Sequence, residues 1–522
     1  EISGAIIAIT LVMSAVFIPV AFLSGPVGIF YRQFSLTLAI SIIISGINAL
    51  TLTPALCAII LKEHSGHKSG FWQKFFDKFN FYYNKTENKY TSWVKFLVGR
   101  KPITIGVLIA FALLTFGAGA ILPSGFIPPE DQGMVYINVT TPPGSTVERT
   151  EEVLDRIDEV VKKIPYVESV STLAGYSLMS EVAGSSYGMG MINLKSWDQR
   201  EESVNDLIAY LYENTNHIND AQIDFYSPPT VPGFGNTGGF EFRILDKSGK
   251  GDLQATYKVS QDIINTLNKE EAIANSFSGF DPNFPQYLVE VDQDIAAKKG
   301  VTIENAMSTL QTLLGSYYAT NFIRFGMMYK VMVQAKPEYR VNPEDILKLY
   351  VKNTRGEMVP FNTFISIKKV FGPEQLTRYN MYTSAMVNGD VKPGYSSGDA
   401  VAAIEKVAAE KLPKNYDYEW SGMTREQILS GNQAIFIFII CLIFVYLLLA
   451  AQYESFLLPL AVLLPLPAGI FGAFFFLWIF GLENNIYAQV ALVMLIGLLG
   501  KNSILIVEFA IQKNQSGMSE MQ

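Results

Sequence analysis

Cysteine and histidine are scarce in this chain of 522 residues, which has two cysteines and three histidines. Cys57 and Cys441 fall in separate apolar segments, so no disulfide framework is expected. His64 and His67 lie in a basic loop and His217 in an Asn-rich turn, without the spacing of a metal site. We identify no nucleophile elbow and no phosphate-binding loop. We therefore expect no enzyme, no bound metal and no cofactor.

Long apolar segments are, by contrast, numerous. Six have the length and composition of membrane-spanning helices: 2–23, 36–61, 103–122, 434–451, 457–480 and 486–511. The first begins just after Glu1, without an initiator methionine or a basic region, so it does not resemble a cleaved signal peptide. We expect the chain to be an internal fragment of a longer membrane protein.

Basic residues are concentrated in the connection from 62 to 101. It has nine lysines and arginines against three acidic residues, so we expect it to be cytoplasmic. Its middle alternates aromatic and basic side chains, which is typical of an amphipathic helix on a membrane surface. The region from 123 to 433 would lie on the opposite side and carries most of the acidic residues behind the net charge of −8. A large external region without disulfides favours a bacterial periplasm.

Apolar periodicity divides the external region into two similar units. Strands are expected at 134–141, 167–173, 189–194 and 221–226, with helices from Thr146 and over 201–214. This β-α-β-β-α-β order is that of a ferredoxin-like split motif. It repeats after the linker 233–239, with strands at 240–245, 274–278, 384–387 and 416–421 and helices at 253–267 and 397–412. Residues 287–371 interrupt the repeat with strands at 288–291 and 329–334, a helix from Thr302, and an aromatic hairpin over 315–333.

Lys501 places a positive charge inside the apolar segment 486–511. At ~1.5 Å per residue it would lie roughly 22 Å along the helix, where a charge costs about 2.5–3.5 kcal/mol on insertion scales. Such a lysine normally faces a polar partner and marks an ion or proton pathway; a structural lysine that caps nearby backbone is the alternative. The other apolar segments contain no carboxylate, and Glu508 is about 10 Å away, so we expect the partner outside this sequence. Gly497 and Gly500 would let a neighbouring helix approach closely.

Short motifs occur in a distinctive order along the whole chain. They are Tyr31-Arg32-Gln33-Phe34-Ser35, Thr53-Pro54-Ala55-Leu56-Cys57, Asp131-Gln132-Gly133, Arg378-Tyr379-Asn380, Ser430-Gly431-Asn432-Gln433, Tyr453-Glu454-Ser455 and Gly500-Lys501-Asn502. In this order and at these distances they resemble the resistance–nodulation–division superfamily of bacterial efflux pumps, specifically the hydrophobe/amphiphile branch.

The resemblance implies a fold and its divisions: an α-helical polytopic membrane protein with a large α+β periplasmic region. The chain would run from about the fifth to the tenth of twelve family helices. The divisions would be two transmembrane helices (1–61), a cytoplasmic amphipathic connection (62–102), a transmembrane helix (103–122), a first ferredoxin-like porter subdomain (123–237), a second one in two halves (238–286 and 372–433) around an inserted docking or funnel subdomain (287–371), three transmembrane helices (434–511) and a cytoplasmic end (512–522).

The resemblance also implies a function, which is efflux of amphiphilic small molecules driven by the proton-motive force. Such pumps are homotrimers in the lipid of the bacterial inner membrane, where they work with a periplasmic adaptor protein and an outer-membrane channel; no nucleic acid is involved. Lys501 would be the proton-relay residue, supported by Asn502. Its partners would be two aspartates on the fourth family helix, outside this sequence.

A substrate pocket is implied by position in the first porter subdomain. Gly175, Tyr176, Ser177, Leu178 and Met179 would form a switch loop after the strand 167–173. The pocket-lining candidates would be Met134, Tyr136, Ser171, Leu173, Tyr176, Leu178 and Met191. Ser171, Leu178 and Met191 stand where well-known drug pumps have phenylalanine, so this pocket would offer less aromatic stacking surface. Ordinary core packing is the alternative for each residue.

Two other functions are compatible with the sequence. Met179, Met189 and Met191 flank the switch region, and clustered thioethers would suit export of copper(I) or silver(I) by a pump of the same superfamily. The external region could instead be a membrane-anchored periplasmic scaffold or receptor, which would leave Lys501 without a role.

Overall fold

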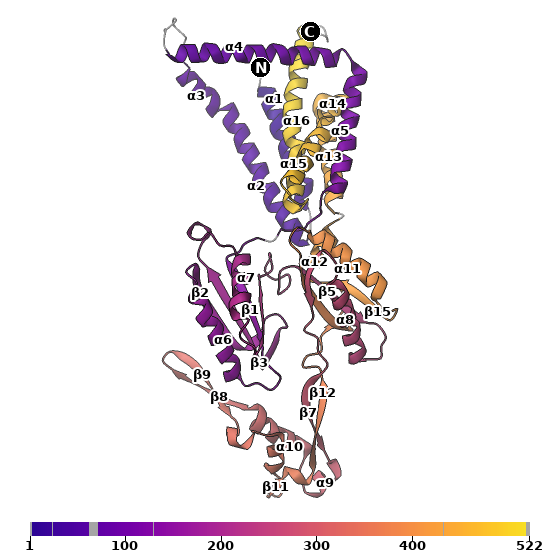
Figure 1. Cartoon of the computed structure of the whole chain (residues 1–522). Helices are drawn as coiled ribbons and strands as arrows, with labels where there is room; N and C mark the ends of the chain where they lie inside the picture. The colour runs from indigo at the N-terminus through magenta and orange to yellow at the C-terminus, as the bar shows by residue number, and fades with distance from the viewer. Residues whose placement is uncertain (1–2, 23–24, 62–70, 129, 432, 518–522) are drawn as a thin grey trace.

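The computed structural model describes residues 3–22, 25–61, 71–128, 130–431 and 433–517. Apolar helices gather at one end of the molecule, two sheet-and-helix units follow, and a narrow extension leads away from them (Figure 1). The apolar helices are α1 (Ser3–Ala15), η1 (Pro19–Phe22), α2 (Gly25–Leu50), α3 (Leu52–Ile60), α5 (Lys101–Ile121), α13 (Gln433–Tyr453), α14 (Leu458–Leu463), α15 (Leu466–Ile479) and α16 (Ile486–Gln515).

Five helical stretches in the described residues are long and apolar enough to cross a membrane: Gly28–Ile60, Lys101–Ile121, Gly422–Tyr453, Leu458–Ile479 and Ile486–Gln515. The expected first span is instead a shorter apolar helix, because α1 ends at Ala15 and Pro19 begins a separate 3-10 turn. The helix of the second expected span begins at Gly25 rather than Leu36, so the polar residues Arg32 and Gln33 lie within α2.

The basic connection forms a long helix, α4 (Phe71–Val98), as predicted. It lies across the end of the apolar helices that is farthest from the sheets (Figure 1). From Phe75 onward its side chains are exposed, and they include the expected aromatic residues. The predicted basic residues between 62 and 70 lie outside the described residues.

The first sheet has the predicted β-α-β-β-α-β sequence of elements. Its members are β1 (Met134–Thr140), α6 (Val147–Val161), β2 (Val167–Ser177), β3 (Val182–Leu194), α7 (Val204–Thr215) and β4 (Gln222–Tyr226), preceded at α7 by the turn η2 (Trp197–Gln199). The strands are antiparallel in the order β2-β3-β1-β4. One face packs on α6 and α7, with Val135, Ile137, Ile192 and Phe225 among its buried side chains.

The second sheet is assembled from two separated stretches of chain. They supply β5 (Phe240–Asp246), α8 (Leu253–Leu267), β6 (Ile273–Phe277), β13 (Arg378–Tyr379), β14 (Tyr382–Val391), α11 (Ser397–Lys411), β15 (Tyr416–Trp420) and then α12 (Gly422–Gly431). The strand order is β13-β14-β5-β15, and β6 also pairs with β14. Residues that precede and follow the predicted insertion therefore share one core.

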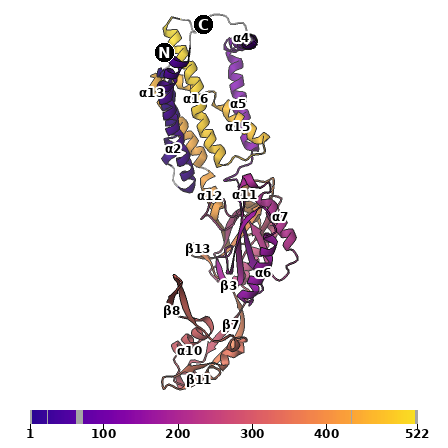
Figure 2. The same cartoon turned by 90° about the vertical axis from the view of Figure 1, so that its left-hand side faces the viewer.

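The narrow extension begins as a two-stranded ribbon of β7 (Phe284–Val291) and β12 (Ile365–Gly372). Beyond it lie α9 (Gln293–Lys298), α10 (Ile303–Leu310), the π-helical turn η3 (Gln311–Gly315), β8 (Tyr317–Arg324), β9 (Met327–Val333), the turns η4 (Pro337–Tyr339) and η5 (Pro343–Lys348), β10 (Tyr350–Lys352), β11 (Met358–Pro360) and η6 (Phe361–Thr363). The predicted aromatic hairpin exists as β8 and β9, which pair only with each other and stand away from the other elements (Figures 1 and 2).

Candidate functional site

Lys501 lies in the middle of α16, and its side chain is exposed on the surface of the helix bundle. No carboxylate of the described residues comes within 4.0 Å of its ammonium group. Asn502 is also exposed, whereas the Ser503 hydroxyl donates a hydrogen bond to the Leu499 carbonyl oxygen of its own helix, at 3.2 Å. The lysine thus projects from the helices of this chain rather than into them.

Glycines on α16 allow the close packing that the sequence suggested. A Cβ at Gly497 would lie 3.5 Å from Met13 of α1, and one at Gly500 would lie 3.9 Å from Val462 of α14. Both glycines are buried, as is Ile504 one turn after Gly500. The buried stripe of α16 therefore fixes the helix against α1 and α14 and leaves Lys501 on the other side.

The beginning of α16 is tied to the second sheet unit through the segment that follows α5. The Asn484 amide donates to the Pro123 carbonyl oxygen at 2.9 Å, and the Gly125 amide donates to the Asn484 carbonyl oxygen at 3.3 Å. The same segment accepts a hydrogen bond at Ser124 from the Gly398 amide, at 3.1 Å, in the first turn of α11. A movement of the helix that carries Lys501 can thus reach α11 through backbone contacts alone.

Five predicted pocket residues lie on one face of the first sheet, opposite α6 and α7. Tyr136 is directly opposite Met191 on β3, and Met191 is opposite Ser171 on β2. Met134 and Leu173 are each two residues from a member of this row and share its face. Tyr226 of β4 continues the row, with its ring 5.7 Å from that of Tyr136. Leu173 is 53% exposed, so core packing does not explain this residue.

The predicted switch loop is largely strand in the structure, which corrects the expectation. β2 continues through Gly175 and Tyr176 to Ser177, so only Leu178 and Met179 lie in the turn before β3. Gly175 has a φ of +99° and lies at an irregularity in the β2–β3 pairing. Such a kink interrupts the alternation of apolar and polar residues by which a strand is recognised in the sequence. The Ser177 hydroxyl donates to Asn138 at 2.8 Å and is buried.

This hairpin end contacts the second sheet unit at Glu374 and the linker 233–239 that leads to that unit. The Tyr187 hydroxyl donates to the Glu374 carboxylate, and the Asn236 side chain donates to Glu181 at 3.0 Å. Met179, at the turn, is 8% exposed and faces a pocket between the two units.

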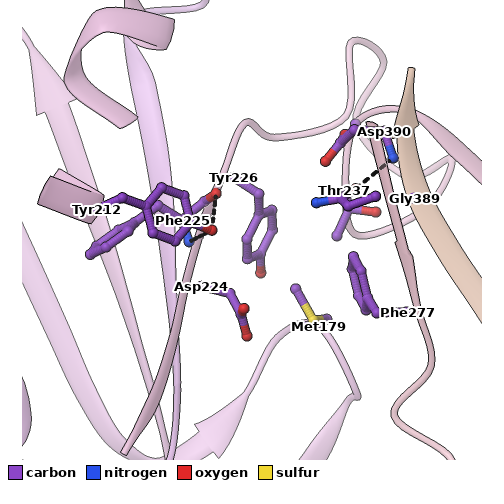
Figure 3. Close-up of a pocket in the computed structure, with 11 residues that line it drawn as sticks. Met179, Tyr212, Asp224, Phe225, Tyr226, Thr237, Phe277, Gly389 and Asp390 are labelled. Atoms are coloured by element: carbon purple, nitrogen blue, oxygen red, sulfur yellow. Dashed lines mark hydrogen bonds between the residues drawn. The ribbon is translucent and has the colours of Figure 1, made fainter. Parts of the chain in front are cut away.

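The pocket between the units is a cavity of about 40 Å³ in this structure, enough for no more than a few water molecules. Figure 3 shows Asp224 and Tyr226 of the first unit facing Phe277 and Gly389 of the second across it. Its lining comprises Met179, Tyr212, Asp224, Phe225, Tyr226, Thr237, Gly238, Asn275, Phe277, Gly389 and Asp390. Of the predicted site residues only Met179 is among them, and Tyr136 adjoins the pocket through Tyr226.

Two carboxyl groups of this pocket are poorly solvated. Burial raises the pKa of Asp224, and hydrogen bonds from Gln222 and Asn138 oppose this only in part. Burial likewise raises the pKa of Asp390 against the effect of a hydrogen bond from Asn275. The sequence analysis did not identify either residue, because each lies in an ordinary strand pattern. At Asp224, an acidic residue among apolar strand positions could have indicated a functional site.

Residues 394–398 match the G-x-S-x-G pattern of a nucleophile elbow, which qualifies the expectation drawn from the sequence. Ser396 is buried and forms a capping box with Asp399 at the start of α11, where its oxygen accepts from the Asp399 amide at 3.2 Å. The serine thus has a structural partner at the helix end.

Comparison with known proteins places the whole chain in one family. The model of the AcrB/AcrD/AcrF family matches residues 1–522. The chain is 38% identical to the toluene efflux pump membrane transporter TtgB of Pseudomonas putida strain DOT-T1E, over 99% of this chain and 50% of that protein. It is 37% identical to the multidrug export protein AcrF of Escherichia coli K12, over 100% and 51%, and 35% identical to the multidrug resistance protein MdtF of the same strain, over 99% and 50%.

The chain spans about half the length of the curated relatives it matches. Since the family model covers every residue, from α1 to the end of α16, the chain belongs to the AcrB/AcrD/AcrF family.

Proposed function

We propose that this chain serves in proton-driven export of amphiphilic small molecules. The observation that carries the proposal is Lys501, an ammonium group near the middle of a 30-residue apolar helix. A charge is costly there, so the residues that carry one are usually functional. Relatives of the chain are named as multidrug and solvent efflux pumps, which supports the same function.

Lys501 would act as the proton-relay residue, with Asn502 as a nearby hydrogen-bonding group. Because the lysine projects away from α1 and α14, a carboxylate partner outside the described residues could approach it. Protonating such a carboxylate removes the attraction that holds the two groups together in a poorly solvated site. The resulting displacement of α16 would pass through Asn484 and the segment 123–126 to α11 and the second sheet unit.

The two sheet units would be the ferredoxin-like porter subdomains, at 123–237 and at 238–286 with 372–433. The exposed sheet face with Tyr136, Ser171 and Met191 would belong to the substrate route, together with Tyr176 and Leu178 beside the hairpin turn. Residues 287–371 would be the docking subdomain. We also propose a bacterial inner-membrane location, a homotrimer, and partnership with an adaptor and an outer-membrane channel. That the chain is a fragment from the fifth to the tenth family helix stays a prediction.

Reconstituted transport tests the proposal. Vesicles that contain the protein as it occurs in its host would receive an imposed proton gradient, and movement of a fluorescent amphiphile and of protons would be followed together. The proposal predicts that dye transport requires the gradient and stops with a protonophore. Dye transport that is indifferent to the gradient would contradict proton coupling, and binding without any transport would favour a receptor.

The soft-metal alternative has weaker structural support. Met189 and Met191 are two residues apart on β3 and share the exposed sheet face, but Met179 lies at the hairpin turn and lines the pocket without them. Growth of a pump-deleted strain in silver and in amphiphilic dyes, with and without this protein, separates the two functions.

A further inference from the structure

Two carboxylates line the pocket between the sheet units, one from each unit. Asp224 lies on β4 of the first sheet, and Asp390 lies on β14 of the second. Both are close enough to Tyr212 for their charges to influence its hydroxyl. The residues that line the pocket include no lysine, arginine or histidine, and neither aspartate has an ion-pair partner among the described residues. The recess therefore carries negative charge that no lining residue neutralises.

Tyr226 provides a second, independent sign of an absent ligand. Its side chain is 8% exposed, and its hydroxyl has no hydrogen-bond partner within the described chain. Figure 3 shows this hydroxyl directed into the pocket, between Asp224 and Met179. Leaving a buried hydroxyl unpaired destabilises the folded protein, so such a group is usually kept where a ligand or water can pair with it.

The remaining walls suit the apolar part of a cation. The rings of Tyr226 and of Phe277, which comes from the second unit, line opposite sides of the pocket. Aromatic faces attract ammonium and other organic cations, and the attraction grows when water is excluded. Aromatic rings combined with two uncompensated carboxylates therefore favour an organic cation over a neutral or anionic molecule.

We propose that this pocket selects organic cations, with Asp224 and Asp390 as the residues that determine charge preference and Tyr226 as a hydrogen-bonding contact. The proposal rests on the export function proposed above and specifies its substrate class. The recess of about 40 Å³ is smaller than such a molecule, so its walls must move apart to admit one. When the recess narrows again, the carboxylates lose water, and the recess no longer has the volume to hold a bound cation.

The test compares two dyes, ethidium, which is permanently cationic, and Nile red, which is neutral. Transport of each would be measured in cells that produce the wild-type protein or Asp224→Asn, Asp390→Asn and the double variant. Because each substitution removes a poorly solvated negative charge at nearly constant volume, we expect the ratio of ethidium to Nile red export to fall about tenfold in the double variant. Asp262→Asn, at an exposed position of α8, removes one charge outside the pocket and should keep the wild-type ratio.

Other outcomes would overturn the proposal. An unchanged ratio in the double variant would show that the carboxylates do not select charge, and an equal loss of both dyes would assign them a role in folding or in export as a whole. Melting temperatures of the purified variants identify a folding defect. If the wild-type protein exports neither dye, the export function fails; fluorescence polarisation of ethidium bound to purified wild-type protein and double variant then tests charge selection by itself, and equal affinities would contradict it.

Discussion

Asp131 shows how one side chain can organise the entry into the first sheet. It accepts hydrogen bonds from the Arg200 guanidinium at 2.6 and 2.9 Å, from the Val204 amide at 3.0 Å and from the Gly133 amide at 2.8 Å. Arg200 is only 3% exposed, so its charge depends on this partner. Burial opposes ionisation of Asp131, but these hydrogen bonds and the charge of Arg200 outweigh it and lower its pKa.

Replacing Asp131 with alanine should destabilise the protein by about 3 kcal/mol, because a buried guanidinium loses its partner. Since the folded-state pKa is lowered, this contribution is present above the ordinary pKa of 3.8 and is lost as the pH falls through the folded-state value. Thermal unfolding of purified protein at neutral pH measures it. Asp220→Ala is the control, because the Asp220–Arg156 pair is about half exposed on both sides and should contribute less than about 1 kcal/mol. Equal effects of the two substitutions would contradict the assigned role.

Asp390 should instead reduce stability in its ionised form. Because burial raises its folded-state pKa, the penalty is absent below the ordinary pKa of 3.8 and complete once the pH exceeds the folded-state value. Asp390→Asn should therefore raise the melting temperature at pH 8, by an amount of the order of 2 °C, and change it less at pH 4. Differential scanning calorimetry at the two values checks this, and a lower melting temperature of the variant at pH 8 would count against it.

Single residues differed in how well the sequence revealed them. Lys501 was evident because a charge interrupts an apolar run, which is a local signal. Asp224 and Asp390 were not, because they are far apart in the sequence and acquire a shared environment only where two folded units meet. Tyr136, Ser171 and Met191 were named as pocket candidates from the family resemblance; strand alternation places them on one face of the sheet, and their role in binding stays a prediction.

At the scale of elements, β8 and β9 form an exposed aromatic hairpin that packs on little else. Phe322 and Tyr329 stack at 5.4 Å, while Phe325 at the turn is 83% exposed. The small core beside the hairpin includes Leu310 and Leu314 but no residue of β8 or β9. Exposed aromatic clusters of this kind are typical of protein–protein contacts.

Replacing residues 317–333 with a short Gly-Ser turn should change stability by less than about 1 kcal/mol but prevent assembly with partner subunits or exit-duct proteins. Co-purification from crosslinked cells measures the assembly, and shortening the exposed turn 249–251 serves as the control. An intact, active assembly without the hairpin would rule out the docking role.

The contact between Ser124 and Gly398 is the second element-scale test. A Cβ at Gly398 would lie 2.5 Å from the Ser124 carbonyl oxygen, so Gly398→Val must displace the segment that links α16 to α11. We expect a folded protein that binds dye but transports it at least about tenfold more slowly, because the movement of α16 no longer reaches the second unit. Ala402→Val adds the same kind of bulk at an exposed position of α11 and should transport normally. Normal transport by Gly398→Val would exclude this route.

Element types were largely predictable from periodicity, and the exceptions have local causes. The apolar pattern up to Phe22 did not show that Pro19 would divide it into α1 and η1. The kink at Gly175 hid the true length of β2, since alternation of apolar and polar residues is lost at an irregular pairing. Pro465 similarly separates α14 from α15 within one predicted segment.

At the scale of the whole molecule, α16 joins two regions. Its middle carries Lys501, and its beginning holds the segment 123–126 against the second sheet unit. This arrangement was outside the reach of sequence reasoning, because it depends on hydrogen bonds from Asn484 to Pro123 and from Gly398 to Ser124, which join residues far apart in the chain.

Gradient-driven dye transport by the Lys501→Met protein tests this account most directly. Methionine keeps length and apolar volume but removes the charge, so a carboxylate partner would stay protonated and the cycle would stop. We expect transport to fall to the rate of leakage while folding and dye binding persist. Lys501→Arg should restore little, because a planar guanidinium does not fit the site of an ammonium. Lys513→Met, at the exposed end of the same helix, should transport normally. Near-normal transport by a well-folded Lys501→Met protein would contradict the account and leave Lys501 a structural residue.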